Sequence, residues 1–227
     1  MSVIGHVRDV LTGGVKPLGP RFFSAIDKHE RIGPVRVGVE GLDGDEQGDR
    51  RAHGGPDKAV HLYSHEHYAH WIEELGALPV LVAPGAFGEN LHVDGLLEGN
   101  VCLADTVRVG SAVLQVSQAR QPCWKLNHRF GVPDMARRVQ EQARTGWYCR
   151  VLSPGELRAG DAIELVERPY PEWPLDRLLR LLYRSGSTDA DLAPALQLPL
   201  VPSWRNLLER RLETRTVEDW RRRLFGE

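Results

Sequence analysis

The most constraining feature of this chain is the uneven distribution of its glycines. Of 23 glycines, 21 lie within residues 1–168, and only Gly186 and Gly226 lie beyond that point. Glycine adopts the backbone conformations that tight turns need, and it is unfavourable inside helices. The distribution therefore predicts short β-strands joined by turns up to about residue 168, followed by a helical remainder.

Short apolar segments lie between these glycines and predict the strands. Two other stretches, His65–Leu75 and Pro133–Arg144, read as helices. Many short strands with long, irregular connections are typical of a closed or nearly closed β-barrel that carries functional loops. The predicted strands are Val3–Leu11, Val35–Val39, Ala59–Tyr63, Thr106–Val109, Val113–Gln118, Trp147–Leu152 and Ala162–Glu167.

A proline-rich stretch, RPYPEWP at Arg168–Pro174, predicts a linker, which gives a β-barrel domain over residues 1–168 and a helical domain over residues 169–227. Capping-box spacing of Thr216 and Asp219 predicts the start of the last helix. A first helix is predicted by one apolar face made of Leu175, Leu178, Leu179, Leu182 and Tyr183, and the later ones by Asp189–Leu196, Ser203–Leu212 and Thr216–Leu224.

Composition excludes several classes of protein. The 227 residues are 41% hydrophobic and 26% charged, with a net charge of −2, which is ordinary for a globular protein and argues against nucleic-acid binding by bulk charge. The arginines near the C-terminus alternate with carboxylates, which indicates a solvated helix face. No apolar run approaches the roughly 20 residues of a membrane helix, and no secretory signal is visible. Three cysteines do not suggest a disulfide framework, so we expect a cytoplasmic protein that does not associate with membranes.

Two polar loops are candidates for ligand binding. In HGGPDKAV (His53–Val60), Gly54 and Gly55 would bring N–H groups close to an anion and Lys58 would add a positive charge, although an ordinary turn explains the same residues. In GAFGENL (Gly85–Leu91), the amide of Asn90 can both donate to and accept from a heterocycle edge, and the alternative is a turn residue bonded within the protein.

A third loop, SQARQPCWKLN (Ser117–Asn127), places Cys123 near Arg120, Lys125 and Asn127. Positive charge favours a thiolate, which can act as a nucleophile, a redox sensor or a soft metal ligand. An inert buried thiol remains the alternative. The other two cysteines, Cys102 and Cys149, lie in apolar segments and are expected to be structural.

The histidines do not form a recognisable site. His61, His65, His67 and His70 lie close together, but His65-Glu66-His67 does not have the spacing of an H-E-x-x-H zinc site. We interpret them as helix-start and surface residues. No pattern fixes a base, an orienting group and an oxyanion hole for a Cys–His hydrolase, and the absence of C-x-x-C gives no support for a zinc ribbon.

An ordered set of segments resembles the MOSC family, named for the C-terminal domain of molybdenum-cofactor sulfurases, and within it the YiiM branch. The similarity covers nearly the whole chain and ends with a helical segment, SWRNLLERRL followed by EDWRRRLFGE. In chain order the other segments are SAIDK, GVEGLDGDEQGD, HGGPDKAVHLY, GAFGENL, VSQARQPCWKLN and GWYCRVL.

The resemblance implies a mainly β protein, a MOSC-type β-barrel with a few helices followed by a small C-terminal three-helix domain. It also implies a bound molybdenum cofactor in molybdopterin form, with Cys123 as the metal ligand and catalytic residue. By position, the resemblance makes cofactor contacts of Ser24, Lys28, His53, Gly54, Gly55, Asp57, Lys58, Asn90, Arg120 and Asn127.

Members of this branch are similar in reducing N-hydroxylated compounds, including hydroxylaminopurine-type base analogues, to amines. Because the chain has no cysteines to spare for an iron–sulfur cluster, electrons would come from a separate reductase, expected to be a flavoprotein. Two other hypotheses stay open: a non-catalytic carrier of the cofactor or of sulfur, and a partner-binding protein that acts through its helices. The concentration of glycine, lysine and cysteine in the barrel loops speaks against the last.

Overall fold

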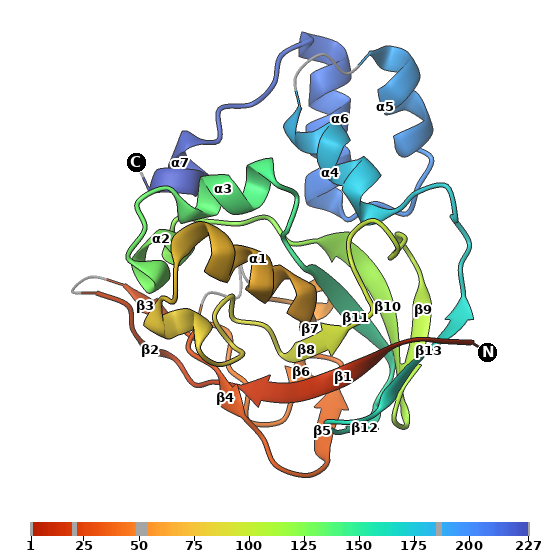
Figure 1. Cartoon of the computed structure of the whole chain (residues 1–227). Helices are drawn as coiled ribbons and strands as arrows, with labels where there is room; N and C mark the ends of the chain where they lie inside the picture. Colours follow the sequence, from red (N-terminus) through yellow and green to blue (C-terminus); the bar gives the residue numbers. More distant parts are fainter. Residues whose placement is uncertain (1, 20–21, 49–53, 185–187, 227) are drawn as a thin grey trace.

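The computed structural model describes residues 2–19, 22–48, 54–184 and 188–226 (Figure 1). Seven strands form a closed barrel, because β1 pairs with both β8 and β13. Neighbouring strands are antiparallel except for β7 and β8, which run parallel. In barrel order the strands are β1 (Ser2–Thr12), β13 (Ala162–Glu167), β9 (Thr106–Val109), β10 (Ala112–Ala119), β11 (Trp147–Ser153), β7 (Val60–Ser64) and β8 (Leu91–Asp94).

Shorter strands extend the barrel at its edges. β4 pairs with the end of β1, β5 lies between β12 and β6 in a small sheet, and β2 pairs with β3. These strands are β2 (Lys16–Pro17), β3 (Phe23–Ser24), β4 (His29–Glu30), β5 (Val35–Gly38), β6 (Gly41–Leu42) and β12 (Gly155–Leu157).

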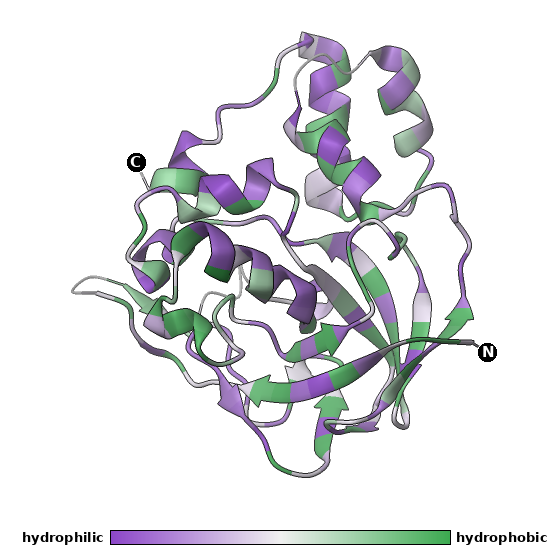
Figure 2. Cartoon of the chain, viewed as in Figure 1, coloured by the Kyte–Doolittle hydropathy of each residue, from purple (hydrophilic) through white to green (hydrophobic). Residues whose placement is uncertain are grey.

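Tight turns join the strands as the glycine distribution predicts. Gly110, between β9 and β10, has a φ of 58°, and a Cβ there would lie 2.3 Å from the carbonyl oxygen of Glu156. Only glycine fits such a position without displacing the neighbouring backbone. Hydrophobic and hydrophilic residues alternate along strands such as β1 (Figure 2). Hydrophobic side chains of β1, such as Val7 and Val10, belong to the core cluster that fills the barrel.

Helices surround one end of the barrel in two groups. α1 (His65–Leu75), α2 (Lys125–Phe130) and α3 (Met135–Glu141) lie together, whereas α4 (Leu175–Tyr183), α5 (Asp189–Ala195) and α6 (Pro202–Thr214) form a separate stack above the barrel (Figure 1). The last helix, α7 (Arg221–Phe225), lies with α2 and α3 rather than with α4–α6. Two single 3₁₀ turns cover Pro56–Lys58 and Pro79–Leu81.

Two hydrophobic clusters hold these parts together. One fills the barrel and continues into α4, α5 and α6 through residues such as Leu178, Leu192 and Trp204. The other joins α1, α2, α3 and α7, and contains Trp71, Leu126 and Leu224 among others. The helical stack α4–α6 therefore shares its core with the barrel, while α7 belongs to the core of the other helix group.

Several expectations from the sequence are confirmed at the level of elements. α1, β9 and β13 begin and end at the predicted residues. The sequence analysis did not predict β8 or α2, because each begins inside a polar loop that was interpreted as a ligand-binding segment, GAFGENL and SQARQPCWKLN.

The predicted last helix, Thr216–Leu224, is wrong in its first half. Arg215 ends α6 in a left-handed conformation with φ of 56°, and between Arg215 and the start of α7 at Arg221 the chain is not helical. The capping box is not formed, because the N–H of Thr216 donates to Thr214 Oγ1 at 3.4 Å and Asp219 accepts from the N–H of Arg221 at 2.8 Å.

Some C-terminal arginines also differ from the expected solvated face. Arg211 is buried and donates to the carbonyls of Leu181 and Leu182, and Arg205 donates to the carbonyls of Leu196 and Leu198. These side chains cap the ends of neighbouring helices, because the final carbonyls of a helix have no partner within it. Within the described residues, no helix combines the length and the apolar character that a membrane span requires.

Candidate functional site

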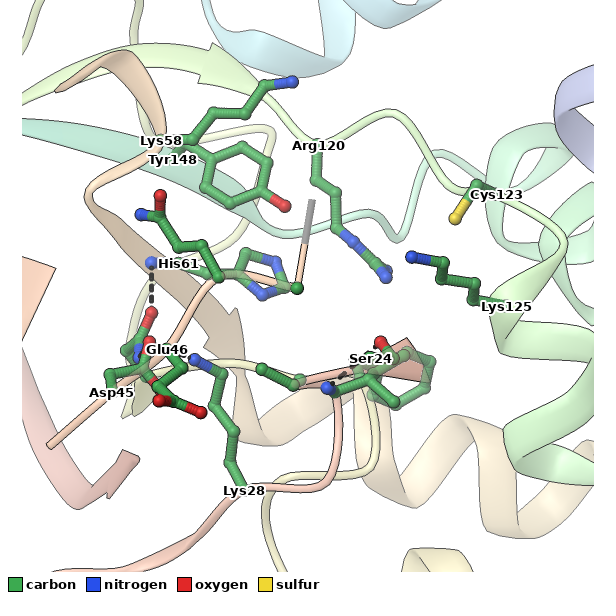
Figure 3. Close-up of a pocket in the computed structure, with 17 residues that line it drawn as sticks. Ser24, Lys28, Asp45, Glu46, Lys58, His61, Arg120, Cys123, Lys125 and Tyr148 are labelled. Atoms are coloured by element: carbon green, nitrogen blue, oxygen red, sulfur yellow. Dashed lines mark hydrogen bonds and ion pairs between the residues drawn. The ribbon is translucent and has the colours of Figure 1, made fainter. Parts of the chain in front are cut away.

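A pocket opens at the end of the barrel where β10 stops and α2 begins, and it encloses about 620 Å³ including its mouth (Figure 3). Its walls come from segments far apart in the sequence. These are the end of β3 and the residues after it, the loop after β6, the 3₁₀ turn at Pro56–Lys58, β7, the loop before β8, the loop after β10 with the start of α2, and β11. The described residues that line it are Ser24, Ala25, Ile26, Lys28, Asp45, Glu46, Gln47, Gly48, Lys58, His61, Phe87, Gly88, Asn90, Arg120, Cys123, Lys125 and Tyr148.

Arg120 is the main cation in the wall of this pocket. Its backbone N–H donates to the carbonyl of Gly146 at 2.9 Å, which fixes the residue directly after β10. The side chain is only 6% exposed, points into the cavity in Figure 3, and its Nη1 has no hydrogen-bond partner among the described residues. A buried guanidinium N–H without a partner is costly, and an anion in the pocket would supply one.

His61 is the second buried group in the wall with an unused atom. It lies on β7, is 3% exposed, and its Nε2 has no partner among the residues that the structure describes. Burial, assisted by the positive charge of Arg120, holds the pKa of His61 well below its usual range. The imidazole is therefore neutral at physiological pH, and its Nε2 lies close to the backbone at Gly146, where a Cβ would come within 2.9 Å of it.

Cys123 lies on the same wall and reaches it from the loop after β10 (Figure 3). The expected basic turn is present, and α2 starts just beyond it at Lys125. Cys102 and Cys149 do not line the pocket, and burial raises the pKa of both thiols. Of the three cysteines, all of which the structure describes, Cys123 is thus the one that lines the pocket.

The charge of the pocket favours an anionic ligand. Lysines and arginine supply four cationic side chains (Lys28, Lys58, Arg120 and Lys125) against the carboxylates of Asp45 and Glu46. Lys28 and Asp45 form a buried ion pair with each other. Burial lowers the pKa of Lys28, and the neighbouring Asp45 opposes that shift.

Asn90 lines the pocket, but its amide is engaged within the protein. Oδ1 accepts from the N–H of His61 at 3.0 Å, and Nδ2 donates to the carbonyl of Leu11 at 3.2 Å and to Asp45 at 2.8 Å. Both amide hydrogens are therefore used, and the expected contact with a heterocycle edge gives way to the alternative of a residue bonded within the protein. Asn90 holds His61 and Asp45 in place.

Glu89 organises the same loop and was not singled out in the sequence. Its fully buried carboxylate accepts from the N–H groups of Gly85 at 2.8 Å and Phe87 at 3.1 Å, and from the hydroxyl of Tyr68. The loop is therefore shaped by an internal acceptor rather than by a ligand.

The glycine-rich segment at residues 54–58 is a turn of which only the lysine reaches the pocket. Gly55, with φ of 92°, donates its N–H to Gln47 Oε1 at 3.2 Å and accepts from the N–H of Lys58. Lys58 lines the pocket, with Nζ 6.0 Å from the ring centre of Tyr148. The expectation of a backbone anion cradle is therefore not supported by the described part of this segment.

Other candidate contacts lie away from the cavity. Gly54, Gly55, Asp57 and Asn127 are absent from the described lining, whereas Ser24, Lys28, Lys58, Asn90, Arg120 and Cys123 are brought together there. Asp57 is ion-paired with Arg150, and the Asn127 amide is bonded to the backbone of Leu224 and Ala136. His53 lies outside the described residues.

Tyr148 and His61 are pocket residues that sequence reasoning missed. Burial raises the pKa of Tyr148, and its ring lies 4.9 Å from that of His61, between centres. The one available signal was a histidine inside an otherwise apolar strand segment, AVHLY, because a buried polar side chain needs a partner.

The interpretation of the histidines as helix-start and surface residues is wrong for His61, and for His67 it is right about the helix start but wrong about the surface. Both are buried, and His67 Nε2 lies 2.7 Å from Glu98 Oε2. His65 is exposed and His70 is partly exposed, as expected. Among the described residues, no three His, Cys, Asp or Glu side chains are placed to hold a metal ion.

Comparisons with known proteins agree with this architecture. The MOSC domain model matches residues 49–164, and the model of the YiiM-like, 3-alpha helix domain matches residues 173–215. Protein YiiM of Escherichia coli (strain K12) is 36% identical over 235 residues, which cover 96% of this chain and 98% of that protein. The crystal structure of YiiM from Escherichia coli superposes with a TM-score of 0.81 at 32% identity, over 98% of this chain and 99% of that one.

A protein of Gibberella moniliformis named reductase is 38% identical over 213 residues, which cover 92% of this chain but 38% of the fungal protein. Its name therefore describes a longer polypeptide. Both family models, placed in order along the chain, and similarity over nearly the full length of YiiM lead to one conclusion: this chain belongs to the MOSC domain family, in its YiiM-like branch.

Proposed function

We propose that the pocket binds the molybdenum cofactor in molybdopterin form, and that the protein reduces N-hydroxylated compounds to amines. One observation carries the proposal: the buried Arg120, whose Nη1 has no hydrogen-bond partner among the described residues, lines the same cavity as Cys123 and His61. Family membership and the fungal relative named reductase support it.

The donor set fits the cofactor. A thiolate is a ligand that soft metal centres prefer, so Cys123 would hold the molybdenum. Arg120 and Lys58 would bind the anionic parts of the pterin, because a guanidinium and an ammonium are the side chains that phosphates select. Neutral His61 and the Tyr148 ring would contact the less polar part.

The reaction consumes an N-hydroxylated compound, two electrons and two protons, and it releases an amine and water as the N–O bond breaks. When bound, the cofactor supplies two-electron oxygen-atom transfer. The chain would hold the substrate beside Cys123. Bulk water would be excluded there, since His61, Arg120 and Cys123, which form this part of the cavity wall, are buried. A separate reductase, of the flavoprotein class, would deliver the electrons.

The test is to produce the protein in cells that synthesise molybdopterin and to measure molybdenum per chain, followed by turnover of N-hydroxylated adenine with a chemical reductant. We expect near-stoichiometric metal and formation of adenine, and loss of both in Cys123→Ser. Bound cofactor without turnover under several reductants would identify a carrier instead. Absence of molybdenum from the folded wild-type protein would overturn the proposal.

A further inference from the structure

The C-terminal segment at residues 220–226 returns from the helical stack to the loop that carries Cys123. α6 ends at Thr214, and α7 then lies beside α3 (Figure 1). Leu224 is buried in the same cluster as Leu126 of α2 and Val139 of α3. This segment lies beyond the residues matched by the helix-domain model, which end at 215.

Backbone contacts join this segment to the loop. The N–H of Trp124, the residue after Cys123, donates to the carbonyl of Arg223 at 2.8 Å. The Asn127 side chain donates to the carbonyl of Leu224 at 2.8 Å. Gly226 lies against the ring of Trp124, where a Cβ would come within 3.2 Å of the indole.

The Arg223 side chain secures the other side of Cys123. Its guanidinium donates to the carbonyl of Pro122 and to Oε1 of Gln140 on α3. It also lies 4.8 Å from the ring centre of Trp220 and 5.5 Å from that of Tyr183 on α4. One planar group thus contacts the cysteine loop, α3 and the helical stack at once.

The loop needs these contacts because its own backbone cannot supply them. Pro122 has no N–H, and the N–H of Trp124 lies ahead of α2, where helical donors have no partner within the helix. Without Arg223, the Pro122 carbonyl and the Trp124 N–H would lose the partners described above. Without Leu224 the Asn127 side chain would lose one as well, so the loop would lose its fixed shape.

We propose that residues 220–226 form a clamp that positions the Cys123 turn, with Arg223 as its positioning residue. The role as a support for a metal ligand rests on the proposed function, whereas the clamp itself does not. Residues 220–226 would thereby shape the part of the pocket wall around Cys123, although Arg223 and Pro122 are 101 positions apart in the sequence.

The test uses hydrogen exchange of the full-length protein, measured by mass spectrometry without added cofactor. In Arg223→Gln we expect amide exchange in residues 121–127 to rise at least ten-fold, while exchange in strands β9 and β10 stays within two-fold of wild type. Arg222→Gln is the matched control, because Arg222 is the exposed neighbour on the same helix. Arg223→Lys keeps a cationic donor and should recover part of the protection.

A second variant tests a contact of the clamp that does not involve the Arg223 side chain. Asn127→Asp keeps the acceptor for the N–H of Ala136 and removes the donor to Leu224, so it should raise exchange in the same peptide by a smaller factor. Unchanged exchange in 121–127 for Arg223→Gln, or a similar rise in β9 and β10, would overturn the proposal. Molybdenum content measured in parallel is a separate readout: a wild-type protein without metal would refute the proposed function and leave the exchange result valid.

Discussion

The two loops that meet at the pocket, residues 85–91 and residues 120–125, differ in where their polar groups find partners. In the first, Glu89 and Asn90 bond to backbone and side chains of the protein. In the second, Arg120 Nη1 has no partner in the described structure, and the loop is secured by the distant C-terminal segment. A loop bonded within the protein sets the shape of a site, whereas a buried cation without a partner in the wall of a pocket is available to an anionic ligand.

The largest effect is expected at the thiol of the second loop. Cys123→Ser should remove most of the bound molybdenum and the N-reductase activity and leave the fold unchanged, because serine is nearly isosteric but a much harder ligand. Metal analysis and circular dichroism check this. A serine variant with full metal content and full turnover would refute the assignment of Cys123.

The next largest effect is expected for Arg120→Gln, which removes the buried cation of the second loop. Loss of a buried charged donor to an anion costs about 1.5–3 kcal/mol, so cofactor retention should fall roughly ten- to hundred-fold. Arg150→Gln is the matched control, since Arg150 is ion-paired with Asp57 outside the pocket lining. Equal retention in the two variants would mean that the pocket does not bind its ligand through Arg120.

A substitution in the first loop should act on stability instead. Glu89→Gln places an amide N–H₂ where a carboxylate accepts from Gly85, Phe87 and Tyr68, at a cost of about 2 kcal/mol in the free energy of unfolding. Denaturant unfolding measures it. If the variant keeps its stability and loses cofactor alone, the contrast between the two loops is wrong.

Lys58 tests whether residues 54–58 resemble the second loop. We expect Lys58→Glu to weaken cofactor retention several-fold more than Lys16→Glu, because charge reversal in a partly enclosed pocket is screened less than at the surface. Lys16 is half exposed and pairs with Asp27 at 3.2 Å, which makes it the control. Bound molybdopterin is compared at matched salt, and equal contents would place the anion contact at Ser24, Lys28 or Arg120.

The smallest effect is expected outside both loops. Cys102→Ala and Cys149→Ala should each cost about 1 kcal/mol of stability, as small buried truncations do, and leave metal content intact. Thermal unfolding and metal analysis check this. Loss of metal at normal stability in either variant would show that a second thiol belongs to the site.

Local pattern was sufficient for the elements whose residues interact mainly with their neighbours in sequence. The alternation in Thr106–Val109 and Ala162–Glu167 and the helical period in His65–Leu75 predict these elements to the residue. The same local view failed at Thr216, where capping-box spacing is present but the Thr216 N–H donates to Thr214 Oγ1 and Glu218 pairs with the buried Arg211 instead.

For the candidate site, the sequence singled out Cys123, Arg120 and Lys58 as residues of unusual chemistry, and the family resemblance united them around a cofactor. The sequence could not show that Asn90 bonds within the protein while Arg120 Nη1 does not, because both are polar residues in polar loops. That distinction depends on which backbone groups lie within hydrogen-bond distance after folding.

By itself, the sequence determined the barrel, the helical remainder and the family, since glycine spacing, strand alternation and ordered motifs are properties of the chain read in order. Only the tertiary structure decided that His61 and Tyr148 line the pocket, and that Arg223 lies beside Pro122. Contacts between residues about 100 positions apart leave no local period, and closure of the barrel and packing of α7 bring them together.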